Sequence, residues 1–372
     1  MNIPPDPAEH LDTTAVGERV ATRVRARIEA LDADALDADA QDRAARGGHR
    51  PRRRVVLALA GTTAAAATAA IVFETRPGLL PEDEDGYVHV ASVTPPVLQL
   101  KPTEEPAKQT LLALADRVEK LSDPPASEWV YTKKWAWYLN TWGDAPLGAA
   151  TAATPRTIET WVRTDGSGHE RSEFAEPIFP NPDSEQAARE GKLVDGTGVE
   201  EDEFGPAGHR RPFRLPDEVT KLATRLRRVE QIEENGRAQL LTEVGERSGA
   251  LGGIGTSEQP TAKQRAAVLR LLAEADYYFD FGTSDYGPLQ TYTTTTWQGR
   301  RALAVSSQQQ PGHDPEYPKH YSRQTLLISP DSGEIIGDEE ALFGDPLKLN
   351  LKHVPATLSI TEVLERRAAK PS

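Results

Sequence analysis

Cysteine is absent from this chain of 372 residues, and its absence excludes several kinds of chemistry at once. The chain can form no disulfide, no zinc site built on thiolates, no cysteine nucleophile and no lipid anchor attached to cysteine. The net charge of −14 argues against a nucleic-acid partner, because such partners require basic surfaces. The length allows one or two domains.

Catalytic motifs are also lacking: the sequence has no Gly-x-Ser-x-Gly elbow, no Walker-type phosphate loop and no His-Glu-x-x-His pair. GALGGIG (249–255) is rich in glycine, but no βαβ unit surrounds it, and we interpret it as a loop before a helix. HDPEYPKH (313–320) contains metal-ligand residue types at irregular spacing between prolines, and we interpret it as a flexible loop. We therefore expect no cofactor, no metal ion and no enzymatic activity.

Aromatic residues are missing from residues 1–54, and a long uncharged run follows them. The 19 residues from Val55 to Phe73 carry no charge. As a helix they would be about 28 Å long, which suits a hydrocarbon core about 30 Å thick. We therefore expect a transmembrane helix at 55–73. A cleaved export signal, including one of the twin-arginine type, and a buried core helix are the alternatives.

Charge is distributed unequally around this run. Arginines precede it and acidic residues follow it: Arg43, Arg46, Arg50, Arg52, Arg53 and Arg54 on one side, and Glu74, Glu82, Asp83, Glu84 and Asp85 on the other. Because the positive flank of a span stays in the cytoplasm, we expect the N-terminus inside and the C-terminal domain outside the cell membrane. All six tryptophans and all nine tyrosines follow the run, which favours a folded extracytoplasmic part.

The segments on either side of the predicted span have no core-forming pattern. Residues 1–54 read as a largely disordered, partly helical cytoplasmic tail, either solvated or docked on a cytoplasmic regulatory protein. Residues 74–106 are rich in proline and acid and read as a stalk. Within the stalk, YVHVASV (87–93) alternates in the manner of a strand.

Residues 107–372 alternate between helical and strand-like patterns. Amphipathic spacing predicts helices at 109–121, 215–232 and 261–275, the last with Thr261 as its N-cap. Alternating apolar residues predict strands at 129–139, 289–297, 301–309, 321–329, 334–342 and 356–364, and a hairpin at 157–174 around Asp165-Gly166. A second hairpin turn is expected at Gly333, and residues 175–215 read as a long loop.

Short connections between strands favour an antiparallel sheet, so we expect an α+β domain with helices packed on one face. One strand, WVYTKKWAWYL, places four aromatic side chains on a single face: Trp129, Tyr131, Trp135 and Trp137. Trp161 and Trp297 extend this candidate surface. It can line an apolar ligand site, or it can be ordinary sheet core.

The order of these elements resembles a family of actinobacterial single-pass membrane proteins whose role is not characterised. The resemblance covers nearly the whole chain and is carried by the arginine-flanked span, WVYTKKW, TIETWVRTDGSGHERSE and LLISPDSGEIIGDE. ISPDSGEII is also similar to the late hairpin of LolA-like lipoprotein carriers and RseB-like half-barrels. These resemblances imply a curved half-barrel sheet around helices, an apolar hollow for acyl chains or a peptide, and a non-enzymatic role.

Three functions follow as hypotheses. The first is a membrane-anchored extracytoplasmic binding or sensing protein for a lipid, a lipopeptide or another envelope partner. The second is a transmembrane regulator of a sigma factor through residues 1–54, since some members of the resembling family lie beside extracytoplasmic-function sigma factors. The histidine and cysteine zinc pattern of many anti-sigma domains is missing here. The third is a cell-envelope hydrolase, which needs clustered carboxylates or histidines in a cleft.

Overall fold

The computed structural model describes residues 88–89, 95–142, 150–179, 182–191, 194, 197–206, 215–228, 231–248, 259–282, 284–310, 321–343, 351–352 and 356–370. Within these ranges, no helix combines the length and the apolar character that a membrane crossing requires. The predicted tail at 1–54 and the predicted span at 55–73 lie outside the described residues. GALGGIG, HDPEYPKH and all of YVHVASV except Val88 and His89 lie outside them too.

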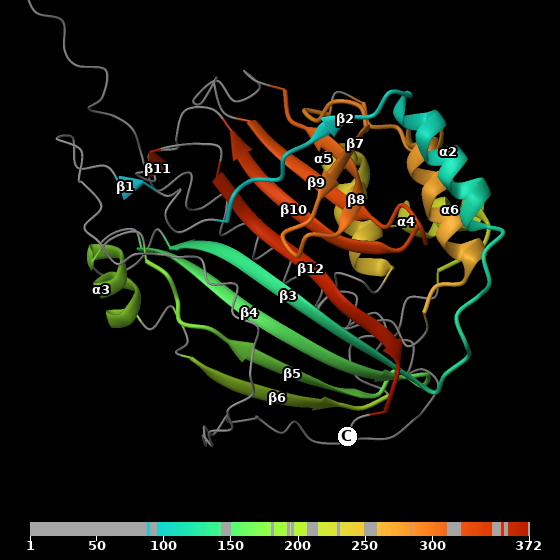
Figure 1. Ribbon diagram of the computed structural model, residues 1–372. Helices are drawn as coiled ribbons and strands as arrows, with labels where there is room; N and C mark the ends of the chain where they lie inside the picture. Colours follow the sequence, from blue (N-terminus) through green and yellow to red (C-terminus); the bar gives the residue numbers. More distant parts are fainter. Residues whose placement is uncertain are drawn as a thin grey trace, which may run out of the picture.

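Ten strands form one curved sheet in the order β2-β7-β8-β9-β10-β12-β3-β4-β5-β6, and every neighbouring pair is antiparallel (Figure 1). The strands are β2 (Lys101–Pro102), β3 (Trp129–Trp142), β4 (Ala150–Arg163), β5 (Gly168–Phe174), β6 (Gly198–Phe204), β7 (Gln290–Thr295), β8 (Arg301–Gln308), β9 (Tyr321–Ile328), β10 (Ile335–Phe343) and β12 (Ala356–Ala368). The sheet is not closed, since β2 and β6 are its two edges. The predicted antiparallel α+β fold is confirmed. A separate parallel pair joins β1 (Val88–His89) to β11 (Leu351–Lys352).

The two predicted hairpin turns form where glycine supplies a positive φ angle. Gly166 has φ 84°, and the Asp165 carboxylate beside it accepts a hydrogen bond from the Ser167 N–H at 2.9 Å. Gly333 has φ 69°, and a Cβ at this position would lie 2.7 Å from a methyl carbon of Val118. Glycine at 333 is therefore required both by the turn and by the close approach of a helix.

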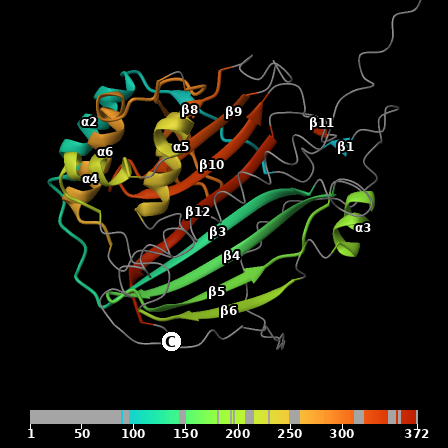
Figure 2. The same ribbon diagram turned by 180° about the vertical axis from the view of Figure 1, so that it is seen from behind.

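The helices are α2 (Ala107–Val118), α3 (Pro182–Glu190), α4 (Val219–Leu226), α5 (Gln231–Arg247), α6 (Ala262–Ala273) and α7 (Ala275–Tyr278). Four of them, α2, α4, α5 and α6, bury leucine-rich faces against β8, β9, β10 and β12 in one hydrophobic core. The predicted cap of α6 is confirmed as a capping box, in which Thr261 and Gln264 each bond the other's backbone N–H. Figures 1 and 2 show α3 standing apart from these helices.

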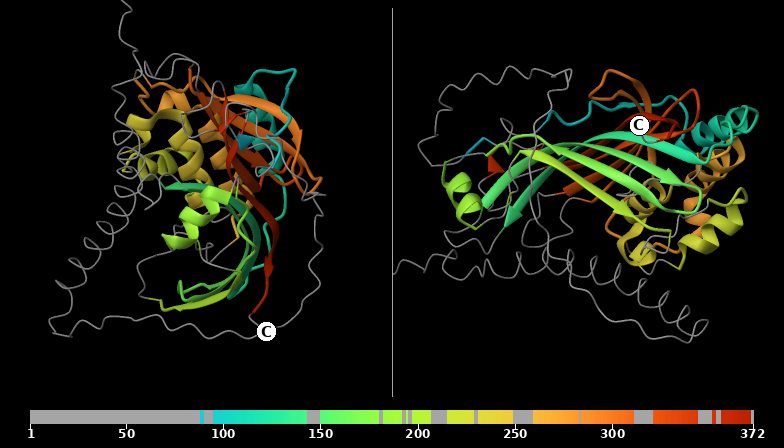
Figure 3. Two further views of the ribbon diagram at one scale, coloured as in Figure 1. Left: turned by 90° about the vertical axis from the view of Figure 1, so that its left-hand side faces the viewer. Right: turned by 90° about the horizontal axis from the view of Figure 1, so that it is seen from below.

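The two faces of the sheet have different neighbours. The inner face carries Val305, Leu326 and Val363 and packs on the four helices. The outer face carries Ala304 and Leu327 and is crossed by residues 95–102, on the side opposite α5 (Figures 1 and 2). Figure 3 shows that the sheet bends toward the helical side. The helices thus cover one face, as predicted, but mainly its β8–β12 half, while β3 to β6 extend beyond them.

Two local predictions were wrong. The long loop predicted at 175–215 contains α3 and β6. β6 is an edge strand that is almost wholly exposed, so pairing with β5 rather than burial holds it extended, and its sequence has no apolar alternation to detect. The single helix predicted at 215–232 is two helices, because α4 ends at Leu226 and α5 runs on to Arg247. Gly236 is non-helical, at φ 72° and ψ −155°, so the Asn235-Gly236 turn signal marks a real break within α5.

Candidate functional site

All six aromatic residues proposed from the sequence lie on the outer face of the sheet. On β3, Trp135 is the cross-strand neighbour of Glu362, whereas Lys134 is the neighbour of Val363 in the helical core. Alternation along the strand therefore directs Tyr131, Trp135 and Trp137 away from the helices. These side chains therefore do not face the helices.

The aromatic residues form two groups, one at the start of β3 and one at its middle. Tyr131 lies 5.1 Å from Trp161 between ring centroids, and Trp161 stacks on His169 at 5.4 Å. The Tyr131 hydroxyl donates to Glu159 at 2.7 Å, and burial together with this carboxylate raises the pKa of Tyr131. Trp129 belongs to this end, with the Arg163 guanidinium 6.0 Å from its ring. These contacts stabilise the sheet surface at this group.

The second group borders a groove of about 900 Å³. Trp135 on β3 and Trp297 in the turn between β7 and β8 both line it, with ring centroids 6.4 Å apart, and both are only partly buried. Trp137 is 2% exposed and packs with Ile360, and Trp135 and Trp297 pack against this cluster, so Trp137 supports the groove without lining it. The remaining lining is mostly apolar or hydroxyl-bearing: Pro96, Val97, Leu98, Gln99, Lys101, Thr293, Thr294, Thr295, Thr296, Arg301, Ala302, Leu303 and Pro330.

Two segments that are distant in sequence form the walls of this groove, and hydrogen bonds to a buried glutamate hold each of them in place. One wall is residues 95–102, which we call the strap; the Leu98 N–H donates to Glu339 at 2.7 Å. The other wall is the β7–β8 turn, in which the Thr296 hydroxyl and Arg300 donate to Glu362 at 2.6 and 2.7 Å. Both carboxylate side chains are 0% exposed. Trp297 joins the walls, because its indole N–H donates to the Pro96 carbonyl at 3.0 Å.

Sequence reasoning missed both glutamates and the strap. Glu339 lies in EIIGDEEAL and Glu362 in ATLSITEVL, which were read only as strands. Glu362 follows Leu358 and Ile360 in an apolar alternation, which is the signal that marks a buried, partnered charge, whereas Glu339 lies between Asp338 and Glu340 and carries no such signal. Residues 95–102 were assigned to the stalk, but their backbone is bound to the sheet from Pro95 onward.

The inner face carries a separate group of charged residues on β3, β10 and β12. Lys134 is 1% exposed, and burial lowers its pKa to about 8, opposed by Glu170. Burial also raises the pKa of Asp338 to about 7, with Glu246 and Glu340 acting in the same direction. An amine and a carboxylic acid with such values both change charge near neutral pH. Burial lowers the pKa of Arg366 on β12 to about 10.

Across the described residues, histidine, aspartate and glutamate side chains form no group of three that could hold a metal ion. A scan against models of protein families found no match for this chain, and a search of curated proteins found none. The geometry of the groove and of the faces around it is therefore the basis for the function proposed below.

Proposed function

We propose that this chain is a non-enzymatic, membrane-anchored extracytoplasmic protein that binds an apolar envelope ligand, a lipid or lipopeptide, in the outer-face groove. The single observation that carries this proposal is the pair of partly buried tryptophans, Trp135 and Trp297, that line a groove of about 900 Å³. Ligand pockets have volumes of roughly 300–1,000 Å³ and are lined mainly by apolar and aromatic groups.

Construction of the groove supports this proposal. The groove is lined by residues of β3, β7 and β8, and its walls are fixed by the buried carboxylates of Glu339 and Glu362. A site held in this way is formed before a ligand arrives, so little ordering opposes binding. In the complete arrangement that we propose, residues 1–54 are cytoplasmic, residues 55–73 span the membrane, and the half-barrel-like domain stands outside the cell.

Tryptophan quenching tests the ligand site. The probe is 9,10-dibromostearate, whose bromine atoms quench tryptophans that they contact, added to the full-length chain. We expect saturable quenching that decreases strongly in a Trp135→Phe, Trp297→Phe double variant. Trp129→Phe is the matched control, since Trp129 lies on the same strand and the same face but outside the groove, and it should leave most of the quenching intact.

Equal quenching in the double variant and the control would remove the groove as the site. Native mass spectrometry of the chain purified from a bacterial host is the complementary measurement. We expect a co-purified apolar molecule that is lost in the Trp135→Phe, Trp297→Phe variant. Absence of any bound lipid, lipopeptide or envelope protein in both measurements would count against the binding function itself.

A further inference from the structure

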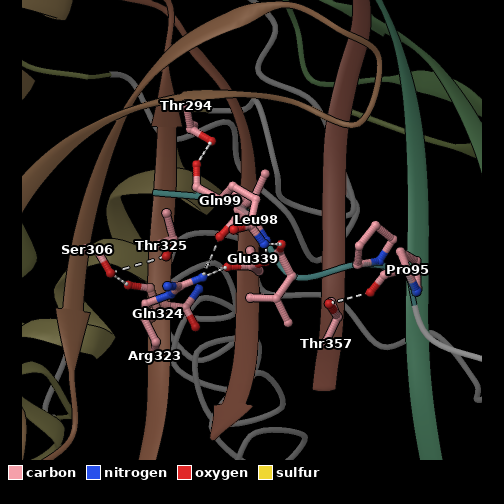
Figure 4. Close-up of polar contacts among 12 residues, drawn as sticks. Pro95, Leu98, Gln99, Thr294, Ser306, Arg323, Gln324, Thr325, Glu339 and Thr357 are labelled. Atoms are coloured by element: carbon pink, nitrogen blue, oxygen red, sulfur yellow. Dashed lines mark hydrogen bonds and ion pairs between the residues drawn. The ribbon is translucent and has the colours of Figure 1, made fainter. Parts of the chain in front are cut away.

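The strap is bound to the sheet through its backbone at nearly every step (Figure 4). The Pro95 carbonyl accepts from the Thr357 hydroxyl at 2.9 Å, and the Gln99 carbonyl accepts from the Thr294 hydroxyl at 2.8 Å. Lys101 then pairs with Thr293 as part of β2. In this way the strap crosses the outer face of β12, β10, β9 and β8 before it joins β7. Pro95 and Pro96 have no N–H, so carbonyls supply the first contacts.

Glu339 lies at the centre of this path. One carboxylate oxygen accepts from the Leu98 N–H at 2.7 Å and the other from Arg323 at 2.7 Å, while Arg323 also donates to the Leu98 carbonyl at 3.3 Å. Glu339 and Arg323 thus bind the donor and the acceptor of a single peptide residue. The Leu98 side chain completes the contact by packing against Ala304 and Leu327.

The strap and the groove depend on one another. Pro96, Val97, Leu98, Gln99 and Lys101 all line the groove, and Trp297, which also lines it, is bonded to Pro96. Release of the strap therefore removes one wall and frees the Trp297 indole at the same time. A ligand that touches both the strap and the rest of the groove binds the docked state better than the released state, and so it must stabilise docking.

We propose that the strap is a ligand-responsive latch and that Glu339 is its positioning residue. Binding in the groove favours the docked strap, and release of the strap weakens binding by the same factor. The strap directly follows residues 74–94 and the run at 55–73 in the sequence. Groove occupancy is thereby transmitted to the chain that leads to the membrane. This inference rests on the proposed function of the groove.

Hydrogen exchange on the full-length chain in phosphatidylcholine nanodiscs tests the latch, with 9,10-dibromostearate as the probe. We expect the probe to slow exchange of the Val97–Lys101 amides by about 5-fold or more, with little change in the β3–β4 amides. Glu339→Gln should speed strap exchange by about 10-fold. Because only the docked fraction binds, apparent probe affinity should fall in proportion to the loss of that fraction, which is small while the strap stays mostly docked. Saturating probe should restore protection in this variant.

Two further variants separate the latch from general destabilisation. Thr357→Val removes only the hydroxyl bonded to Pro95 and should shift strap exchange in the same direction by a smaller factor. Glu159→Gln alters an outer-face carboxylate that contacts Tyr131 and Arg171 but not the strap, and it should change neither strap exchange nor probe affinity.

Each outcome decides between the proposals. If Glu339→Gln speeds exchange across the whole sheet and probe does not restore the strap, Glu339 has a structural role only and the latch is wrong. If the probe quenches Trp135 but leaves strap exchange and its Glu339 dependence unchanged, the groove stands and the latch fails. If the probe does not bind the groove, both proposals fail.

Discussion

On the outer face of the sheet, the buried carboxylates of Glu339 and Glu362 each contact an arginine and a backbone N–H, and each fixes a segment distant in sequence. On the inner face, the buried charges of Lys134 and Asp338 have pKa values displaced toward neutrality. Burial raises the pKa of Glu339 as well, so the two faces differ in what the buried charge does: the outer-face carboxylates fix the walls of a groove, whereas Lys134 and Asp338 titrate near neutral pH. The same sheet thus uses ionisable residues in two ways, and the difference can be measured.

The largest effect is expected when an outer-face pair is broken. Arg323→Met leaves the carboxylate of Glu339 buried without its cation, because Glu339 is 0% exposed and Arg323 only 11%. Loss of one partner of a buried pair costs about 3–5 kcal/mol, to be measured as the free energy of unfolding in urea. Arg301→Met is the control: its pair with Asp331 is more than 80% exposed on both sides, so its effect should be close to zero. Similar losses in both variants would contradict the argument.

On the inner face, the contribution of a buried charge to the free energy of unfolding should depend on pH. The pKa of Asp338 is raised to about 7 in the folded chain, so the folded state holds a proton that the unfolded state releases between about pH 4 and pH 7. Its contribution to stability therefore falls as pH rises through this window. Asp338→Asn removes that loss. We expect it to be about 1–3 kcal/mol more stable than the parent at pH 7.5, and nearly equal at pH 4, by urea unfolding.

For Lys134, the change of folding stability with pH has the opposite sign. Its pKa is lowered to about 8 in the folded state, so stability from this group is missing below pH 8 and recovers as pH rises toward 10.5. A parent protein whose unfolding free energy is flat from pH 4 to pH 7 and from pH 8 to pH 10 would show that neither charge is strained.

The helical layer over the inner face gives a smaller effect. Thr261→Ala removes the hydroxyl that accepts from the Gln264 N–H at 3.2 Å at the start of α6. We expect a loss of about 1 kcal/mol in unfolding free energy. Thr261→Ser, which keeps the hydroxyl, should retain most of the stability; an equal loss in both would show that the cap contributes through packing alone.

The smallest effect is expected where outer-face charges are half-exposed. Arg171 on β5 lies 3.2 Å from Glu159 and 3.1 Å from Glu173, with 28% of its side chain exposed. Arg171→Gln should cost about 0.5 kcal/mol in low salt and less at 1 M salt, because screening weakens such pairs. A loss of unfolding free energy as large as that of Arg323→Met would show that buried and half-exposed ion pairs contribute equally to stability.

Several elements were predictable because their signals are local. The period of two along WVYTKKWAWYL, the positive φ angles demanded at Gly166 and Gly333, and the Thr261 cap each depend on residues within a few positions. β6 and α5 were missed for the converse reason. β6 is held by pairing with β5 without burial, and α5 contains a glycine that interrupts its helical pattern.

The sequence alone established that Trp129, Tyr131, Trp135 and Trp137 share a face, because side chains alternate along any strand. Only the tertiary structure decided that this face turns away from the helices and that Trp135 meets Trp297. It alone decided that Leu98 binds Glu339, across 241 positions of chain. Contacts between residues so far apart in sequence depend on the closure of long loops and on burial shared by the whole sheet. Loop closure and shared burial produce no periodic pattern in the sequence around the contacting residues.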